Sequence, residues 1–374
     1  MKTFLSTLDS LPTDSWKALI HSTDEEQILP YLNSDHSRNP IEKFAALLSP
    51  AAAKHLETMA QKAAVLTAQR FGKVIRFYAP MYISNECTNT CTYCGFTMEN
   101  KMTRKSLNAE EAEAEVRYLY DRGFRHILIV SGEHQKIVTP EYISMMVDIC
   151  RKYFPSVTIE VAPFSVEAYE GLVAKGVDGL TVYQETYDRE TYKEVHLRGK
   201  KKDFDWRMTS AERGATAKIR RLNIGVLLGL AADWRFDSVM NAAHLDFLMK
   251  NYWRVQYSIS LPRLCESEAD YEVKSVVSDR DLTQLMLAYR IAFPDLGINV
   301  STREPETLRD GLIGLGVTQM SAESATEPGG YCNPSEALKQ FDITDERKVD
   351  EIFPILKSRG IEPVWKDWES CMIG

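Results

Sequence analysis

Several features that define other classes of protein are missing from this sequence. No hydrophobic run approaches the roughly 18 residues that a membrane-spanning helix needs, and the first residues, Met1 to Ser6, lack the apolar core of a signal peptide. The formal net charge of −8 gives no basis for general nucleic-acid binding. Seven cysteines, an odd number, argue against a disulfide framework and for a reducing compartment. These absences predict a cytoplasmic protein that binds neither membranes nor nucleic acids.

Three of the cysteines lie close together, in the stretch Cys87-Thr-Asn-Thr-Cys91-Thr-Tyr93-Cys94. This C-x3-C-x2-C spacing puts three thiolates on one short loop, which can hold three irons of a cubane 4Fe–4S cluster and leave the fourth iron open. A structural zinc site is the alternative, but zinc takes four ligands, usually as two close pairs. The sequence contains no second close cysteine pair and no Cys-x-x-His. We therefore predict an iron–sulfur cluster with these three cysteines as its ligands.

Short hydrophobic runs alternate with longer amphipathic segments from residue 74 onward. Their near-continuous hydrophobicity is typical of strands that are buried on both faces of a parallel sheet. Eight such alternations predict a (β/α)8 barrel of the TIM type; an open sheet of six strands is the alternative, because the last two runs are the weakest. The predicted strands are Val74–Tyr82, His126–Val130, Val157–Val161, Gly179–Tyr183, Asn223–Leu228, Val255–Leu261, Ile298–Ser301 and Val317–Met320.

The barrel is expected to occupy residues 73–321, between two extensions. Residues 1–72 carry apolar side chains at helical spacing over Pro40–Leu48 and Ala51–Arg70, which predicts a helical extension. Residues 322–374 form a C-terminal extension with a final helix over Asp345–Arg359. Helix starts are predicted at Asn108, Thr139, Ser165 and Ser278, and helix ends at Gly123, Gly176 and Gly360.

Polar residues follow several of the predicted strands, at the end where the loops of a barrel assemble its active site. The second strand ends in Ser131-Gly132-Glu133, where glycine lets the backbone approach a ligand closely; a helix-capping turn is the alternative. The fourth ends in Gln184-Glu185, a pair that is costly to bury without partners, and a structural hydrogen-bond network explains it nearly as well. The fifth contains Gly225, which tight packing alone can also explain.

Arginines follow the sixth and seventh strands. The sixth strand is followed by Arg263, and the seventh by Ser301 and Arg303. Because a guanidinium forms bidentate pairs with carboxylates, Arg303 is predicted to bind the carboxylate of an amino acid, with Ser301 supplying a neighbouring hydroxyl. Arg263 is the next candidate for that role. A surface ion pair between Arg303 and Glu304 is the alternative.

The cysteine loop, with the aromatic Tyr93 just before its last cysteine, resembles the cluster loop of radical S-adenosylmethionine (SAM) enzymes. Other motifs are similar to those of the aromatic-amino-acid lyases of that family, and their combination is most similar to the tyrosine lyases of thiamine biosynthesis. The resemblance extends from about Leu48 to Trp368. The motifs are Tyr82-Ile-Ser-Asn, Ser131-Gly-Glu-His134, Tyr183-Gln-Glu-Thr-Tyr187, Lys201-Lys-Asp-Phe-Asp-Trp-Arg207, Ser258-Ile-Ser-Leu-Pro-Arg263, Ser301-Thr-Arg-Glu304 and Pro363-Val-Trp-Lys-Asp-Trp368.

The resemblance implies a SAM molecule on the open iron of the cluster. The residues it assigns to this cofactor are Tyr93 in the cysteine loop, Ser131, Gly132 and Glu133 at the SAM amino group, Gln184 and Glu185 at the ribose or methionine part, Arg207 at the carboxylate and Gly225 beside the adenine. The role of His134 stays open, and the sequence does not show which group handles the phenol proton of a tyrosine substrate.

The resemblance also implies a reaction and partners. One electron from a donor of the flavodoxin or ferredoxin type leads to a 5′-deoxyadenosyl radical. The Cα–Cβ bond of L-tyrosine then breaks, and the products are p-cresol and dehydroglycine, which passes to thiazole synthase. Relatives that use tryptophan, or that mature FeFe-hydrogenase, are alternatives. The hydrogenase relative carries a second cluster in a C-terminal domain, whereas Cys371 is the only cysteine in the tail of this sequence.

Two further classes of protein compete with this interpretation. A non-catalytic iron–sulfur carrier would explain the three cysteines but not a barrel of roughly 250 residues with polar strand ends. A zinc-dependent barrel hydrolase would explain a metal site and the fold. It should, however, show histidine or carboxylate ligands distributed over the strand ends.

Overall fold

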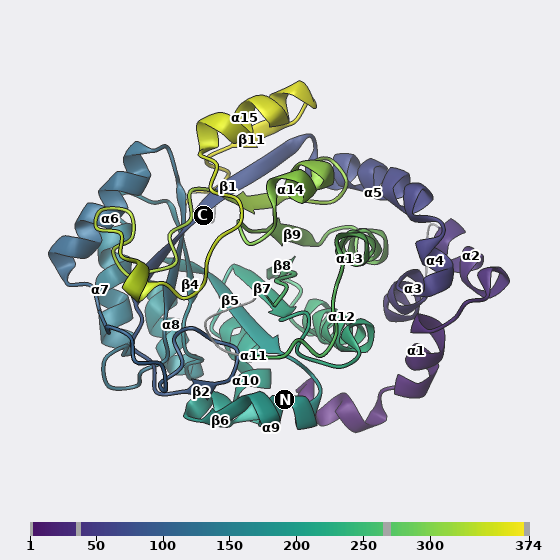
Figure 1. Cartoon of the computed structure of the whole chain (residues 1–374), viewed down its shortest axis with the longest axis horizontal. Coiled ribbons are helices and arrows are strands. Elements are labelled where there is room, and N and C mark those ends of the chain that lie inside the picture. The colour runs from purple at the N-terminus through teal and green to yellow at the C-terminus, as the bar shows by residue number, and fades with distance from the viewer. Residues whose placement is uncertain (1–2, 35–38, 265–270, 370–374) are drawn as a thin grey trace.

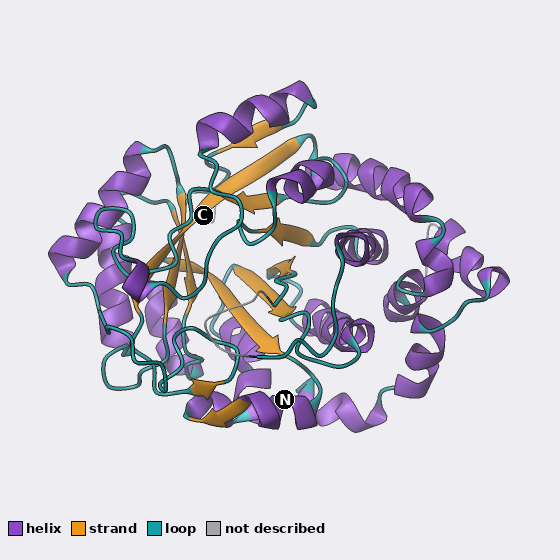
Figure 2. Cartoon of the chain, in the orientation of Figure 1, coloured by secondary structure: helices purple, strands orange, loops and turns teal. Residues whose placement is uncertain are grey.

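A closed barrel of parallel strands forms the centre of the computed structural model, which describes residues 3–34, 39–264 and 271–369 (Figures 1 and 2). The last barrel strand pairs back onto the first, with Phe77 opposite Met320. This pairing excludes the open six-stranded sheet and confirms the predicted barrel. Around it the strands are, in order, β1 (Val74–Ser84), β3 (His126–Ser131), β4 (Ser156–Glu160), β5 (Val177–Glu185), β7 (Arg221–Val226), β8 (Gln256–Ser260), β9 (Gly297–Val300) and β10 (Gln319–Ser321).

Helices join successive strands and cover the outside of the barrel (Figure 2). The predicted caps are confirmed: the side chains of Asn108, Thr139, Ser165 and Ser278 accept hydrogen bonds from backbone N–H groups at helix starts. Gly123 and Gly176 have φ angles of 102° and 103°, a conformation that favours glycine at a helix end. The helices are α6 (Ala109–Asp121), α7 (Pro140–Cys150), α8 (Val166–Ala174), α9 (Arg189–Val195), α10 (Phe204–Met208), α11 (Ser210–Thr216), α12 (Trp234–Asn251), α13 (Asp279–Ala292) and α14 (Glu306–Leu312), with the short η2 (Lys200–Lys202) before α10.

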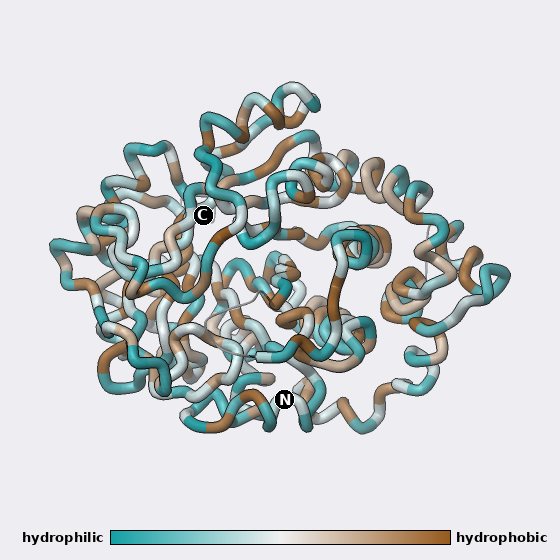
Figure 3. The backbone as a smooth tube through the Cα atoms, in the orientation of Figure 1, coloured by the Kyte–Doolittle hydropathy of each residue, from teal (hydrophilic) through white to brown (hydrophobic). Residues whose placement is uncertain are grey.

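The N-terminal residues form an arc of helices outside α12 and α13 (Figure 1). The arc is held by polar as well as apolar contacts: Gln284 Nε2 on α13 donates to the Leu47 carbonyl at 2.8 Å, and the Phe44 and Tyr289 rings lie 4.3 Å apart. Hydrophobic and hydrophilic stretches alternate along these outer helices (Figure 3). The predicted helix over Ala51–Arg70 is interrupted at Lys54 and His55. The elements are η1 (Leu5–Ser10), α1 (Thr13–Ile20), α2 (Glu25–Asn33), α3 (Pro40–Leu47), α4 (Pro50–Ala53) and α5 (Leu56–Phe71).

The C-terminal segment packs on the first barrel strand. After η3 (Glu336–Leu338), helix α15 (Val349–Ser358) starts four residues later than predicted, and β11 (Glu362–Val364) adds an unpredicted parallel strand beside β1. Beyond β11, Asp367 forms an ion pair with Arg76 at 2.7 Å, at the amino-terminal end of the barrel strands. In the part of the chain that the structure describes, no helix has the length and apolar character needed to cross a membrane.

A buried ion pair ties the C-terminal segment to α14. Arg309 and Asp345 are both fully buried and pair with each other, and Arg347 reaches Asp345 at 2.8 Å. Removing one partner of a buried pair leaves the other charge uncompensated, which costs about 3–5 kcal/mol. We therefore expect Asp345→Asn to lower the free energy of unfolding by about that amount, as measured by chemical denaturation.

The prediction for Asp345→Asn has a matched control, and the stabilisation that Asp345 provides should depend on pH. The exposed Asp350 pairs with Arg122 on the surface, so Asp350→Asn should barely change stability. Burial alone would raise the pKa of Asp345, but Arg347 and Arg309 outweigh burial and lower it. The stabilisation should therefore be complete above the ordinary Asp pKa near 3.9 and disappear as the pH falls through the lower folded-state value. Equal effects of the two substitutions would contradict this account.

Candidate active site

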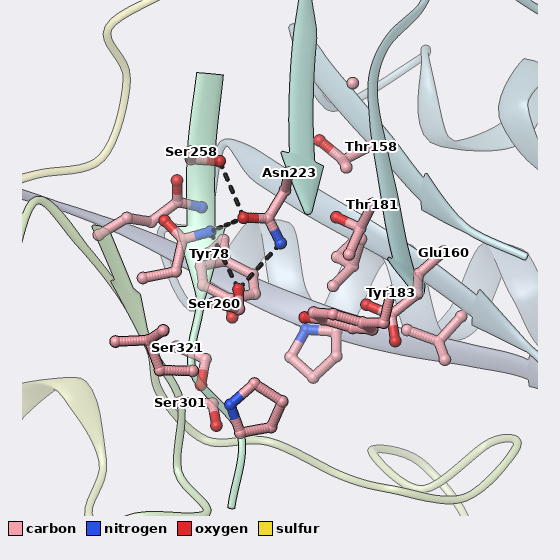
Figure 4. Close-up of a pocket in the computed structure, with 18 of the residues that line it drawn as sticks. Tyr78, Thr158, Glu160, Thr181, Tyr183, Asn223, Ser258, Ser260, Ser301 and Ser321 are labelled. Atoms are coloured by element: carbon pink, nitrogen blue, oxygen red, sulfur yellow. Dashed lines mark hydrogen bonds between the residues drawn. The ribbon is translucent and has the colours of Figure 1, made fainter. Parts of the chain in front are cut away.

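A cavity of about 920 Å³ lies inside the barrel, within the size range of ligand sites. TIM barrels usually fill this space with branched apolar side chains, but here small polar side chains line its middle (Figure 4). Asn223 donates to Ser260 Oγ at 2.9 Å and accepts from Ser258 Oγ at 3.0 Å. The barrel therefore encloses room for polar ligands, between the cysteine loop and the opposite strands.

The cysteine loop follows directly from β1 and is clamped by the loop after β3. The backbone N–H of Gly132 donates to the Ser84 carbonyl at 2.9 Å, and Thr88 N–H donates to the Glu133 carbonyl at 3.0 Å. A side chain at Gly132 would collide with the Glu86 carbonyl, which gives a physical reason for glycine there. A short antiparallel pair, β2 (Thr90–Cys91) with β6 (His196–Arg198), holds the other side of the loop.

Cys87, Cys91 and Cys94 all line the cavity as free thiols. Burial, with a smaller effect of Glu133, raises the pKa of Cys87 to about 11. A thiol of this kind becomes a thiolate when a metal takes the place of its proton. Among the described residues, no three His, Cys, Asp or Glu side chains converge on a point as ligands of one metal ion. A cubane presents a separate iron to each thiolate, so the three thiols suit a cluster.

Four charged side chains form a buried network beside the thiols. Arg207 donates to Glu133 Oε1 at 2.8 Å and to Glu185 Oε1 at 3.3 Å, and Lys201 donates to Glu185 at 2.8 Å. Asn89, inside the cysteine loop, donates to Glu133 Oε2 at 2.9 Å. Burial alone would raise the pKa of Glu133, but Arg207, Lys201 and these hydrogen bonds lower it overall. Glu133 is therefore an ionised acceptor at the edge of the cavity.

The predicted SAM residues do not all meet at this site. Ser131, Gly132, Glu133, Glu185 and Arg207 line the cavity, and within the described part of the chain the buried Ser131 hydroxyl has no hydrogen-bond partner. An unused hydroxyl beside an ionised carboxylate fits a ligand that carries an amino group and a carboxylate, as SAM does.

Gln184 and Gly225 are placed differently from the other predicted SAM residues. Gln184 is not among the residues that line the cavity, although its buried amide has no partner within the described chain. Gly225 does not line the cavity either. A side chain there would meet the Ser260 carbonyl at 2.5 Å and the Tyr183 ring at 2.8 Å, so tight packing gives a physical reason for this glycine.

The two arginines predicted to bind the substrate, Arg303 and Arg263, have different surroundings in the structure. Arg303 lines the cavity, and its guanidinium carbon lies 3.5 Å from the centre of the Phe341 ring. No acidic partner of Arg303 occurs among the described residues. Glu304 instead pairs with Arg263, which also contacts Asp279 at 2.8 Å. Arg263 is thus engaged outside the cavity lining, and the predicted alternative pair of Arg303 with Glu304 does not form.

Two aromatic side chains near the loop have defined contacts. The Tyr93 hydroxyl lies 2.8 Å from His196 Nε2, and its ring lines the cavity beside Cys91 and Cys94. His134 accepts a hydrogen bond from the Lys136 N–H at 3.3 Å and does not line the cavity. The structure therefore gives His134 a local contact within its loop.

Comparison with known proteins decides the family. Residues 81–239 match the family model described as the radical SAM superfamily, and residues 260–362 match the biotin and thiamin synthesis associated domain. The chain is 41% identical to the 2-iminoacetate synthase of Salmonella typhimurium and 40% identical to that of Escherichia coli, in each case over 100% of this chain and 98% of the relative. The chain belongs to the 2-iminoacetate synthase family.

A solved structure supports the same placement. The X-ray structure of the FeFe-hydrogenase maturase HydG from Carboxydothermus hydrogenoformans superposes with a TM-score of 0.89 at 30% identity, covering 100% of this chain and 87% of that chain. As a member of the 2-iminoacetate synthase family, the protein is a radical SAM lyase that uses a 4Fe–4S cluster and SAM. The carrier and zinc-hydrolase alternatives are thereby excluded.

Several residues that the structure places at the site were not predicted from the sequence. Gln340, in the C-terminal segment, donates from Nε2 to Cys94 Sγ at 3.5 Å and accepts from the Tyr82 hydroxyl at 2.9 Å. Hydrogen bonds to cluster sulfurs tune reduction potential. Lys201 and Asn89 join the charged network, and Glu160, the last residue of β4, points into the cavity (Figure 4). Glu160 could have been identified from the sequence, because it is an acidic residue at the end of a buried strand.

Proposed function

We propose that the protein cleaves the Cα–Cβ bond of L-tyrosine, giving 2-iminoacetate (dehydroglycine) and p-cresol for the thiazole part of thiamine. The observation that carries the proposal is the sharing of one cavity by three free thiols and Arg303. The family relationship over the whole chain supports it. A barrel with this layout can hold a cluster with SAM on one side and an amino acid on the other.

The side chains of the cavity then have distinct tasks. Cys87, Cys91 and Cys94 hold the cluster, and Ser131, Glu133 and Arg207 bind the amino-acid part of SAM. The two groups together supply a 5′-deoxyadenosyl radical when bound. The barrel wall excludes water and other hydrogen donors from that radical, while the loops fix the substrate beside it.

Arg303 is the proposed ligand of the tyrosine carboxylate. Its stacking on Phe341 orients the planar guanidinium, and a planar fork suits a bidentate carboxylate. Ser301, whose hydroxyl accepts the Arg303 N–H at 3.4 Å, adds a donor at the same wall. Arg207 and Lys201, which line the cavity beside the thiols, each form an ion pair with a glutamate. Arg303 forms no such pair among the described residues.

Two protein partners follow from this reaction. Dehydroglycine hydrolyses readily in water, so direct transfer to thiazole synthase would protect it; association of the two proteins at low salt is the direct check. The cluster needs a low-potential electron donor of the flavodoxin or ferredoxin type. A reducing compartment such as the cytoplasm suits both the free thiols and the donor.

The proposed function predicts a specific product. Protein reconstituted anaerobically with iron and sulfide, then given SAM, a reductant and tyrosine, should form p-cresol and 5′-deoxyadenosine in comparable amounts. Chromatography with mass detection measures both. Tryptophan in place of tyrosine serves as the competing substrate. Robust SAM cleavage with no p-cresol, or turnover of tryptophan in preference to tyrosine, would refute the assignment.

A further inference from the structure

Glu160 differs from the other acidic side chains of the cavity because no ion pair among the described residues includes it. It is the last residue of β4, and its carboxylate faces the cavity near Tyr183 (Figure 4). Within the described chain, neighbouring charges act on this carboxylate but no hydrogen bond contributes to its pKa. Burial, followed by the charge of Glu185, raises the pKa of Glu160 to about 7. Such a group can both accept and return a proton near neutral pH.

Every other acidic residue that lines the cavity is neutralised. Glu133 and Glu185 pair with Arg207, Glu185 also with Lys201, and Glu304 with Arg263. At the amino-terminal end of the strands, Asp367 pairs with Arg76 and Asp295 with Arg70. Glu160 is half-buried, and no donor of the described chain occupies its oxygens in the hydrogen bonds and ion pairs of the cavity. Its place in the wall of a ligand cavity therefore leaves a carboxylate that can accept a hydrogen bond from a ligand.

The strand order places Glu160 opposite the proposed carboxylate ligand. Counting around the closed barrel from β1, β4 is the third strand and β9, which leads into Arg303, is the seventh of eight. The two strands are thus diametrically opposed. Both side chains nevertheless line the same cavity, and the positive charge of Arg303 offsets part of the rise in the pKa of Glu160 that burial and Glu185 cause. An amino acid whose carboxylate lies at Arg303 would point its side chain toward β4.

We propose that Glu160 accepts the hydrogen bond of the tyrosine phenol and takes its proton while the Cα–Cβ bond breaks. The inference rests on the proposed tyrosine lyase function. The amino group of tyrosine is adjacent to the carboxylate and remains at the Arg303 wall, so the phenol is the donor that reaches Glu160. The phenol O–H bond breaks and an O–H bond forms on Glu160. The proton returns to the oxygen before p-cresol leaves, with no electron exchanged in this transfer.

The proton transfer serves the bond cleavage. A phenolate oxygen releases more electron density into the ring than a phenol does, and this stabilises the benzylic carbon as it separates from Cα. The same contact gives selectivity, because phenylalanine would leave the Glu160 carboxylate without the donor that the phenol provides. Glu160 thereby provides a reason why the site accepts tyrosine.

The test compares Glu160→Gln with wild type. Glutamine can still accept the phenol hydrogen bond but cannot take the proton. We expect p-cresol formed per 5′-deoxyadenosine to fall about 100-fold or more, while iron content and the preference for binding tyrosine over phenylalanine, measured by equilibrium dialysis, are kept. Glu160→Ala should lose that binding preference as well. Asp295→Asn, a neutralised acid at the far end of the cavity, is the matched control and should behave as wild type.

A more acidic substrate separates proton transfer from a structural role. 3,5-Difluorotyrosine, assayed where its phenol is already ionised, should restore product formation in Glu160→Gln, because no proton remains to be taken. Glu160→Asp, which keeps a carboxylate if the glutamine variant fails to fold, should retain part of the activity with tyrosine. Unchanged coupling in Glu160→Gln, or no rescue by the fluorinated substrate, would overturn the proposal while wild-type p-cresol still supports the lyase. Absence of p-cresol from wild type would instead refute the function itself.

Discussion

Replacing Cys87, Cys91 or Cys94 by alanine is expected to abolish SAM cleavage. Each thiol lines the same cavity and is the proposed ligand of one iron, so the loss of one thiol would leave that iron without its protein ligand. The loss should appear as reduced iron and sulfide content after reconstitution and as absence of 5′-deoxyadenosine. These measurements do not depend on tyrosine, and therefore test the cluster separately from the substrate.

The remaining cysteines provide the control. Cys332 is exposed and Cys150 is buried in the helical layer, and neither lines the cavity; Cys265 and Cys371 lie outside the described residues. Cys332→Ser should keep the cluster and full SAM cleavage, and we expect the same of substitutions at the other three. A protein lacking Cys87, Cys91 and Cys94 together that still cleaved SAM reductively would remove the basis of the assignment.

The barrel could be predicted because its strands and helix starts are encoded locally. Runs such as His126–Val130 are hydrophobic on both faces, which suits a parallel sheet. Caps such as Asn108 with Glu111 form within one helical turn. The strand β11 was missed because Glu362-Pro363-Val364 has neither the length nor the hydrophobicity of a strand. It forms because the edge of β1 offers free backbone groups, which is a tertiary effect.

The candidate site could be predicted only where residues that are close in the sequence are also close in the fold. The cysteine loop is one continuous stretch, so its chemistry could be predicted from the cysteine spacing. The partners of charged side chains could not be predicted in this way. Arg263 was a plausible carboxylate ligand from the sequence, but the fold places Glu304 against it. Gln340 reaches Cys94 from 246 positions away in the sequence, and no local pattern announces such a contact. Glu160 has a local signal, but only the closed barrel shows that it stands opposite Arg303.

Replacing Arg303 by alanine should uncouple SAM cleavage from tyrosine cleavage. The guanidinium lines the cavity, stacks on Phe341 and lacks an acidic partner in the described chain. A charge-assisted hydrogen bond contributes roughly 1.5–3 kcal/mol, so tyrosine affinity should fall roughly 10- to 150-fold. Cluster content should not change, because the contacts of Arg303 in the described chain are with Phe341 and Ser301. The measurement is p-cresol formed per 5′-deoxyadenosine over a range of tyrosine concentrations.

Two further variants make the result specific. Arg303→Lys keeps the charge but not the planar fork, so it should recover only part of the coupling. Arg254 also lies over an aromatic ring, with its guanidinium carbon 5.1 Å from the centre of the Trp253 ring, but it is exposed and does not line the cavity. Arg254→Ala should therefore leave both affinity and coupling unchanged. If Arg303→Ala behaved like Arg254→Ala, the substrate carboxylate would have to bind elsewhere, and the orientation that directs the phenol toward Glu160 would lose its support.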